Sequence, residues 1–229
     1  MKKYLLILAA VAATSVTGAI AAPITWTFGN LSEADGHQTY TQGAYTLNVY
    51  AYKTANTNGS GLFSSTPLKG WSGSGLGAGT ESAPNHSVDN DGQDELIVFD
   101  FGNAYYQATS FQFGWTNTDS DADIWVGGSS ALAFSSLCFS GCGAGNALTD
   151  KGFVKYDFDN AGTSVHNIGG PAGRYLIISA AAGSTNDKFK ILAIVGTPPT
   201  RVPEPGSIAL LMLALFALAV SQRRKLSIR

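Results

Sequence analysis

The chain has 229 residues, a formal net charge of −2 and an aromatic content of 11%, which argues against disorder. Between residues 22 and 202 there are eight basic and fifteen acidic residues, so this part of the chain is acidic, with a net charge of −7. Such a domain lacks the basic face that phosphate binding needs, which argues against nucleic acid as a partner. About 180 residues suit one domain with a single core.

The N-terminus has the three-part pattern of a secretory signal. Lys2 and Lys3 provide a charged start, residues 5–13 are apolar, and small residues follow up to Ala21. We therefore predict a signal peptide over residues 1–21, cleaved by signal peptidase after Ala21, with a retained signal anchor as the alternative. In either case the secretion machinery would carry the following domain, residues 22–195, across the membrane.

This domain has the sequence pattern of a sheet protein. In residues 45–52, apolar and polar side chains alternate, which is typical of a half-buried strand. No stretch of the domain has a long apolar period of 3.6 residues, so we expect little helix. The predicted fold is all-β, an antiparallel β-sandwich of jelly-roll type, flanked by an N-terminal signal helix and a C-terminal transmembrane helix. Further strands are expected near residues 24–28, 96–101, 111–115, 124–126, 153–158, 175–179 and 189–195.

Residues 56–95 are polar and rich in glycine, and we expect a long irregular loop there with no convincing strand. The alternating glycines at residues 73–79 lack the preceding strand and following helix of a phosphate-binding loop. Trp71 lies in the same segment. If exposed, it could stack on a sugar ring, and if buried it would be a core aromatic. Trp71 is therefore a candidate ligand-binding residue.

Two acidic runs are candidates for a calcium site. Calcium prefers about six to eight oxygen ligands, which carboxylates placed two residues apart around a turn can begin to supply. In an extended segment such carboxylates share one face and repel each other unless a cation intervenes. The alternative is a polar turn before the strand at Leu96 in the first run, and side chains splayed into water in the second. The candidate ligands are Asp89, Asp91 and Asp94 in the first run, and Asp119, Asp121 and Asp123 in the second.

The chain has two cysteines, Cys138 and Cys142, within a short loop that contains glycine. In an exported chain this arrangement predicts a disulfide, because exported proteins meet an oxidising compartment. A loop this short would gain only about 2 kcal/mol in the chain-entropy model, so the bridge would hold a local loop. Zinc would need further Cys or His ligands nearby.

No catalytic motif stands out in the sequence. The histidines His37, His86 and His166 are scattered, and there is no metalloprotease pair and no nucleophile elbow. We therefore expect a protein that is not an enzyme. A hydrolase on the same sandwich would need paired carboxylates that face each other across a cleft.

The C-terminal end has three parts after a linker at residues 196–201. A Pro-Glu-Pro sequence is followed by an apolar run over residues 208–220 and then by a basic end. This apolar run is short for a spanning helix, which needs about 17 to 25 residues, but the residues that flank it can extend the helix. The basic end would stay in the cytoplasm and Pro203 would lie outside. A buried core helix is the alternative, but prolines before it and a cationic end after it favour a transmembrane helix.

This order of features resembles the PEP-CTERM sorting segment of Gram-negative surface proteins, here residues 202–229. The resemblance implies processing by an exosortase near the Pro-Glu-Pro sequence, and release or attachment at the cell surface, often with exopolysaccharide. The implied route passes through the inner membrane as a sorting intermediate and ends at the surface or outside the cell. The residues that carry the resemblance are Val202, Pro203, Glu204 and Pro205, with Arg223, Arg224 and Lys225 at the basic end.

Two functions follow as hypotheses. The first is a non-enzymatic protein of the cell surface or extracellular matrix, sorted through its C-terminal segment. The alternative is a lectin-like module that binds exopolysaccharide with the help of calcium. Calcium is the one cofactor that the sequence suggests.

Overall fold

The computed structural model describes residues 21–54, 56, 60–80, 86–102, 105–182 and 186–199. Ala22–Pro199 forms one compact unit. The predicted signal helix and the sorting segment lie outside the described residues. In the part of the chain that is described, no helix is long and apolar enough to cross a membrane.

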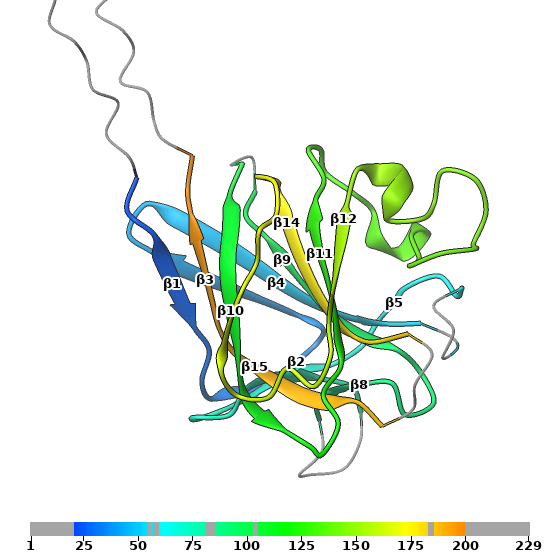
Figure 1. Ribbon diagram of the computed structural model, residues 1–229, viewed down its shortest axis with the longest axis horizontal. Helices are drawn as coiled ribbons and strands as arrows, with labels where there is room; N and C mark the ends of the chain where they lie inside the picture. The colour runs from blue at the N-terminus through cyan, green and yellow to red at the C-terminus, as the bar shows by residue number, and fades with distance from the viewer. Residues whose placement is uncertain are drawn as a thin grey trace, which may run out of the picture. The chain divides into compact units, whose positions relative to one another are not determined.

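The described fold is all-β, with two antiparallel sheets (Figure 1), which confirms the predicted class. The chain changes sheet repeatedly, so strands distant in sequence become neighbours. The first sheet has the order β13 (Val165–Asn167), β10 (Gln107–Thr116), β15 (Lys188–Thr197), β7 (Gly75–Ala78), β6 (Leu68–Trp71) and β2 (Leu31–Ala34), and β1 (Ile24–Thr27) and β8 (Val88–Asp89) also pair with β15. The second sheet has the order β12 (Val154–Phe158), β11 (Ala122–Gly127), β14 (Tyr175–Ala180), β9 (Glu95–Asp100), β4 (Tyr45–Lys53) and β3 (His37–Gln42), and β5 (Ser64–Ser65) pairs with β4.

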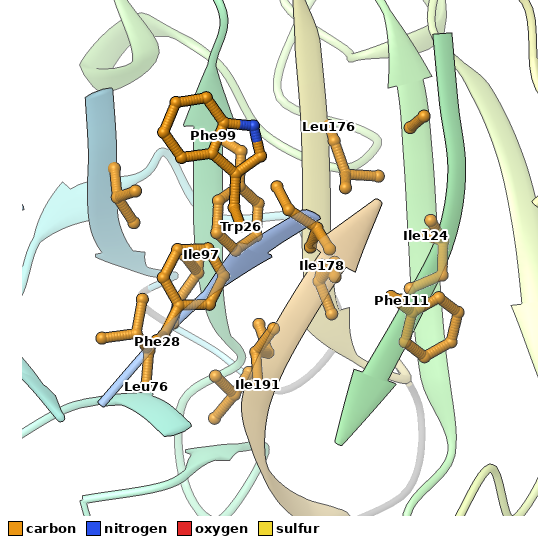
Figure 2. Close-up of a cluster of buried hydrophobic side chains, with 14 of the residues drawn as sticks. Trp26, Phe28, Leu76, Ile97, Phe99, Phe111, Ile124, Leu176, Ile178 and Ile191 are labelled. Atoms are coloured by element: carbon orange, nitrogen blue, oxygen red, sulfur yellow. The ribbon is translucent and has the colours of Figure 1, made fainter. Parts of the chain in front are cut away.

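The main core lies between the two sheets. Figure 2 shows side chains of β9 and β14 facing those of β1, β10 and β15. Phe99, Phe111 and Ile191 in this cluster are almost completely buried. The alternation predicted for residues 45–52 is also seen, because Leu47, Val49 and Ala51 are buried in the core. Burial of these apolar side chains is the main favourable term in the folding of such a sandwich.

The second sheet is buried on its outer face as well. Residues 128–153, here named the covering segment, connect β11 to β12 and contain the short helices η1 (Phe134–Ser136) and η2 (Thr149–Lys151), drawn in yellow-green in Figure 1. Phe134, Phe139 and Leu148 of this segment form a second cluster with outward-facing residues of the sheet such as Val98 and Ile177. Burial on both faces explains why β9 and β14 are apolar at consecutive positions.

The expectation of no strand within residues 56–95 is wrong, because β5, β6, β7 and β8 all fall in this segment. Glycine explains the discrepancy. Gly75 has a φ of 95°, and a Cβ atom there would collide with the backbone carbonyl of Ile191 in β15. Only a residue without a side chain lets the two backbones come so close. The glycines that suggested a loop therefore belong to a closely packed strand.

The two ends of the described domain are neighbours. Ile24 in β1 pairs with Gly196 in β15, at the edge where both strands begin or end in Figure 1. β15 continues to Thr197, past the predicted domain end at residue 195. Its other end, at Lys188, lies at most about 30 Å away, since a straight strand of ten residues rises by about 3.3 Å per residue.

Candidate functional site

The two acidic runs predicted from the sequence meet near the start of β15. Asp89 in β8 pairs with Lys188 in β15, and Asp119 forms an isolated bridge with Asp187. The loop after β10 and the loop after β8 are thus held against the same short segment. This end of the sandwich is the one far from Ile24 and Gly196.

Three carboxylates converge there. Asp119, Asp121 and Asp187 each offer an oxygen, and these oxygens all lie within 4.8 Å of one another. We name these three residues the acidic cluster. Asp187 is fully buried, whereas Asp119 and Asp121 are half-buried. Sequence reasoning missed Asp187, since it stands alone between Asn186 and Lys188 with no acidic neighbour to mark it.

Asp187 is held by a network of hydrogen bonds. Asn90 donates from Nδ2 to Asp187 Oδ2 at 2.6 Å, and the Asp121 backbone N–H donates to Asp187 Oδ1 at 3.0 Å. The Asp187 backbone N–H donates in return to Asn90 Oδ1 at 3.1 Å. Asn90 also donates to the Ala181 carbonyl at 2.8 Å. The pair Asn90 and Asp187 therefore joins the two acidic loops to each other and to the loop after β14.

All three candidates of the first run lie outside the acidic cluster found among the described residues. Asp89 is buried and accepts hydrogen bonds from the Ser87 hydroxyl at 3.0 Å and the Asp91 backbone N–H at 3.1 Å. Asp91 is exposed and forms an ion pair with Lys188 at 3.1 Å. Asp94 is buried, and its backbone N–H donates to Thr54 Oγ1 at 3.2 Å. Hydrogen bonds of this kind are typical of a structured polar turn.

Asp123 is separated from the other two residues of its run. It lies on β11, where Lys155 of β12 reaches it at 3.0 Å and also contacts Asp157 at 2.6 Å. Burial of the carboxyl group raises the pKa of Asp123 to about 6, although Lys155 acts in the opposite direction. The hydrogen bond from Lys155 lowers the pKa of Asp157. Asp123 thus takes part in a local charge group of the second sheet.

Trp71 lies at the end of β6 and is half-buried. The ammonium group of Lys190 lies 3.8 Å from the centre of the Trp71 ring, and the same group lies 5.0 Å from the ring centre of Trp115. Burial, with a smaller contribution from Lys69, lowers the pKa of Lys190. A lysine over an aromatic face is a cation–π contact, so Trp71 already has a partner on that face.

Cys138 and Cys142 form a disulfide in the covering segment, with their Cα atoms 6.1 Å apart. Cys138 is buried, and its backbone N–H and carbonyl both form hydrogen bonds within the segment, to Asn146 and Leu148. Phe139, the next residue, packs edge-on against Phe63 at 4.9 Å between ring centres. The bridge therefore holds the part of the segment that covers the second sheet.

The acidic cluster offers only oxygen ligands, the donor set of hard cations such as calcium. Three carboxylates would supply part of a shell of about six to eight oxygens, with backbone carbonyls and water as the ordinary source of the rest. The same side chains already serve the fold, since Asp121 Oδ1 accepts from the Asn160 backbone N–H at 2.6 Å. The geometry therefore suits two uses, cation binding and the joining of loops.

Comparison with known proteins identifies one segment of the chain. Residues 201–225 match the PEP-CTERM protein-sorting motif. The match begins two residues after the end of the compact unit at Pro199. Searches of characterised proteins and of solved structures found no significant match.

Proposed function

Because this chain carries a PEP-CTERM protein-sorting motif, we propose that it is an exported protein of the cell surface or extracellular matrix, sorted by an exosortase and without enzymatic activity. The observation that carries the proposal is the position of the motif at residues 201–225, directly after a compact β domain. The signal sequence expected at residues 1–21 supports export by the secretion machinery.

The proposed route has three steps. Signal peptidase removes the N-terminal segment, and the apolar run at residues 208–220 holds the chain in the inner membrane as a sorting intermediate. The exosortase then acts near Pro203 and transfers or releases the domain. The neighbouring positions of β1 and β15 support this route, since both ends of the domain leave it at one edge.

The acidic side chains of this domain serve to hold its loops. Asp121 and Asp187 accept hydrogen bonds from backbone N–H groups of other segments, and Asp89 accepts one within its own turn. Carboxylates employed in this way stabilise loops against one another. This is the role expected of a domain that must persist outside the cell.

Mass spectrometry of the protein from membrane, surface and medium fractions tests the sorting proposal. The expected mature species begins near Ala22 and ends near Pro203. The double variant Pro203→Ala, Glu204→Ala should accumulate in the membrane with its tail intact, whereas Thr200→Ala should be processed normally. Wild-type surface material that retains residues 208–229 would show that the tail is an ordinary anchor and would contradict the proposal.

The convergence of Asp119, Asp121 and Asp187 favours a second candidate, calcium-assisted binding of carbohydrate. A divalent cation would relieve the repulsion between these carboxylates and order the loops that carry them. On this hypothesis, retention of the protein on exopolysaccharide is lost on chelation and restored by calcium. The double variant Asp119→Asn, Asp121→Asn should lose retention, and Asp91→Asn should keep it. Retention unaffected by chelation would exclude this candidate.

A further inference from the structure

A pocket of about 320 Å³ lies on the outer face of the second sheet, beside the covering segment. It is distinct from both the acidic cluster and Trp71. Strands β4, β9 and β14 form its floor, and the turn around η1 forms its rim. The residues that matter for its chemistry are Tyr50, Tyr52, Asp100, Arg174, Tyr175 and Phe134.

The register of the strands explains why aromatic rings collect here. In β4 the odd-numbered residues Leu47, Val49 and Ala51 point into the core, so Tyr50 and Tyr52 point outward. Tyr52 lies 5.7 Å from Phe134, measured between ring centres. The ring of His37 on β3 stacks on Tyr50 at 4.6 Å and supports it from the neighbouring strand. The pocket therefore has a preformed aromatic wall.

An ion pair between Arg174 and Asp100 lies beside the aromatic wall. Arg174 donates from Nε and Nη2 to the two carboxylate oxygens of Asp100, both at 2.8 Å. The two opposite charges cancel, and the planar fork geometry holds both side chains in place. Nη1 of Arg174 takes no part in this ion pair, and Asp100 also accepts from the Gly102 backbone N–H at 2.8 Å.

The phenol groups add neutral donors. The Tyr175 hydroxyl oxygen accepts from the Leu132 backbone N–H at 3.1 Å, so its own hydrogen can point to a ligand. Burial raises the pKa of Tyr50, Tyr52 and Tyr175, with a further increase for Tyr50 from Asp100. All three phenols thus remain protonated at neutral pH and can donate as well as accept.

We propose that this pocket binds one pyranose unit of an uncharged polysaccharide. A pyranose has a C–H face that packs on an aromatic ring and a rim of hydroxyl groups that pair with planar polar side chains. The pocket volume lies at the lower end of the range of about 300 to 1,000 Å³ usual for small-molecule sites, which suits one sugar ring. Because Asp100 neutralises Arg174, an acidic sugar would find no unpaired cation here.

This inference rests on the proposed function, because a protein placed at the cell surface meets polysaccharide there. It deepens that function by naming a binding site, a ligand class and the residues in contact. The site needs no metal, which separates it from the calcium-assisted candidate.

Titration calorimetry with defined oligosaccharides tests the proposal. The full chain is purified in a detergent without a sugar headgroup and titrated with cellotetraose, maltotetraose and mannotetraose as neutral probes, and with tetragalacturonic acid as the charged probe. At least one neutral probe should bind saturably, and more tightly than the charged probe. Addition of EDTA should leave this affinity unchanged.

Two variants locate the site. Tyr50→Ala removes part of the aromatic wall and should weaken binding by about tenfold, whereas Tyr50→Phe should keep most of the affinity. Ser135→Trp adds bulk at an exposed rim position, so it should block the pocket without disturbing the core. Tyr105→Ala alters an exposed tyrosine that does not line the pocket and should have no effect. Thermal unfolding of each variant checks that the fold is intact.

Three results would overturn the proposal. The first is that no neutral probe saturates the protein, and the second is tighter binding of tetragalacturonic acid. The third is binding that Tyr50→Ala and Ser135→Trp leave unchanged but EDTA abolishes, which would assign carbohydrate binding to the acidic cluster. None of these results affects sorting, which is judged separately by the mass of the mature chain.

Discussion

Asp187 is the residue on which the acidic end of the domain depends most. It is fully buried and joins the loops after β8 and β10 through Asn90 and the backbone of Asp121. Buried hydrogen bonds to a charged group are among the stronger polar contacts in proteins, and donors left without an acceptor add their own desolvation cost. Asp187 is therefore a structural residue whether or not a cation binds beside it.

Replacement of this side chain tests that role. Asp187→Ala should lower the free energy of unfolding by about 2 to 4 kcal/mol, because the buried Asn90 amide and the half-buried Asp121 backbone N–H both lose this acceptor. Asp91→Ala, which removes an exposed ion pair with Lys188, should cost less than about 1 kcal/mol. Urea denaturation of both variants gives the comparison. Equal losses would mean that the network around Asp187 adds no more than a surface ion pair.

The raised pKa of Asp123 should make the stability of the folded domain depend on pH. Burial raises its pKa from the ordinary value of 3.8 to about 6, so the folded chain holds this proton more tightly than the unfolded chain does. The stability that Asp123 contributes is therefore present below pH 3.8 and is lost as the pH rises through about 6. Over this interval the wild type should lose stability relative to Asp123→Asn.

Urea denaturation at several pH values measures this difference. The Asn variant lacks the ion pair with Lys155 at every pH, so the slope with pH carries the information. Asp159→Asn changes an exposed carboxyl group and serves as the control for altered net charge. A flat difference between wild type and Asp123→Asn would show that burial does not raise this pKa.

At the scale of elements, the covering segment determines the outer face of the second sheet. It supplies Phe134, Phe139 and Leu148 to a cluster that is separate from the core between the sheets. The pocket described above lies at its edge, so the segment also forms part of a binding surface. Its attachment to the sheet thus matters for both stability and ligand access.

Removal of the disulfide should loosen the covering segment. The double variant Cys138→Ser, Cys142→Ser should lose about 2 kcal/mol of stability, the value expected for so short a loop. The sandwich should remain folded, while proteolysis within residues 128–153 becomes faster. Limited proteolysis followed by peptide mass analysis measures this. Cleavage spread evenly over the domain would mean that the bridge stabilises the whole fold.

Gly75 shows how a single backbone position fixes strand β7 against β15. Gly75→Ala would place a methyl group against the Ile191 carbonyl at a positive φ, and we expect a loss of about 2 to 4 kcal/mol. Gly73 has a similar positive φ of 76° but open space around it, so Gly73→Ala should cost only about 1 kcal/mol. Thermal unfolding of the two variants separates steric contact from backbone strain. Equal losses would argue against the close approach of β7 to β15.

At the scale of the whole molecule, the ends of the domain lie together and the acidic cluster lies at the far end of β15. β15 spans this distance, with Gly196 beside β1 and Asp187 directly before Lys188. A domain held through residues beyond Pro199 would be attached at the edge formed by β1 and β15. The acidic cluster would then be remote from the point of attachment.

A truncated chain tests whether the tail alone determines the destination. A chain that ends at Pro199 keeps the compact unit and the signal sequence proposed for residues 1–21, but loses the motif at residues 201–225. It should be exported and recovered from periplasm and medium, and be depleted from the surface relative to the full chain. Cell fractionation with peptide mass analysis provides the measurement. Surface amounts equal to those of the full chain would mean that the β domain itself directs localisation.

The sequence alone predicted the all-β class and the sorting segment. Both are recorded in contiguous residues, as strand alternation at residues 45–52 and as the ordered signals of residues 202–229. Polar or glycine-rich strands such as β2 and β7 escaped prediction, because their pairing is determined by neighbours and by close backbone approach rather than by their own apolar pattern.

Only the tertiary structure decided which side chains meet. In the folded chain, Asp187 lies beside Asp119 and Asp121, whereas Asp123 forms an ion pair with Lys155. Tyr50 and Arg174 line one pocket. These contacts depend on the pairing of segments far apart in the chain, and a register shift of one residue would turn strand side chains such as Tyr50 and Asp123 to the opposite face. Local patterns therefore determined the class of the fold and the sorting motif, while long-range register determined the sites.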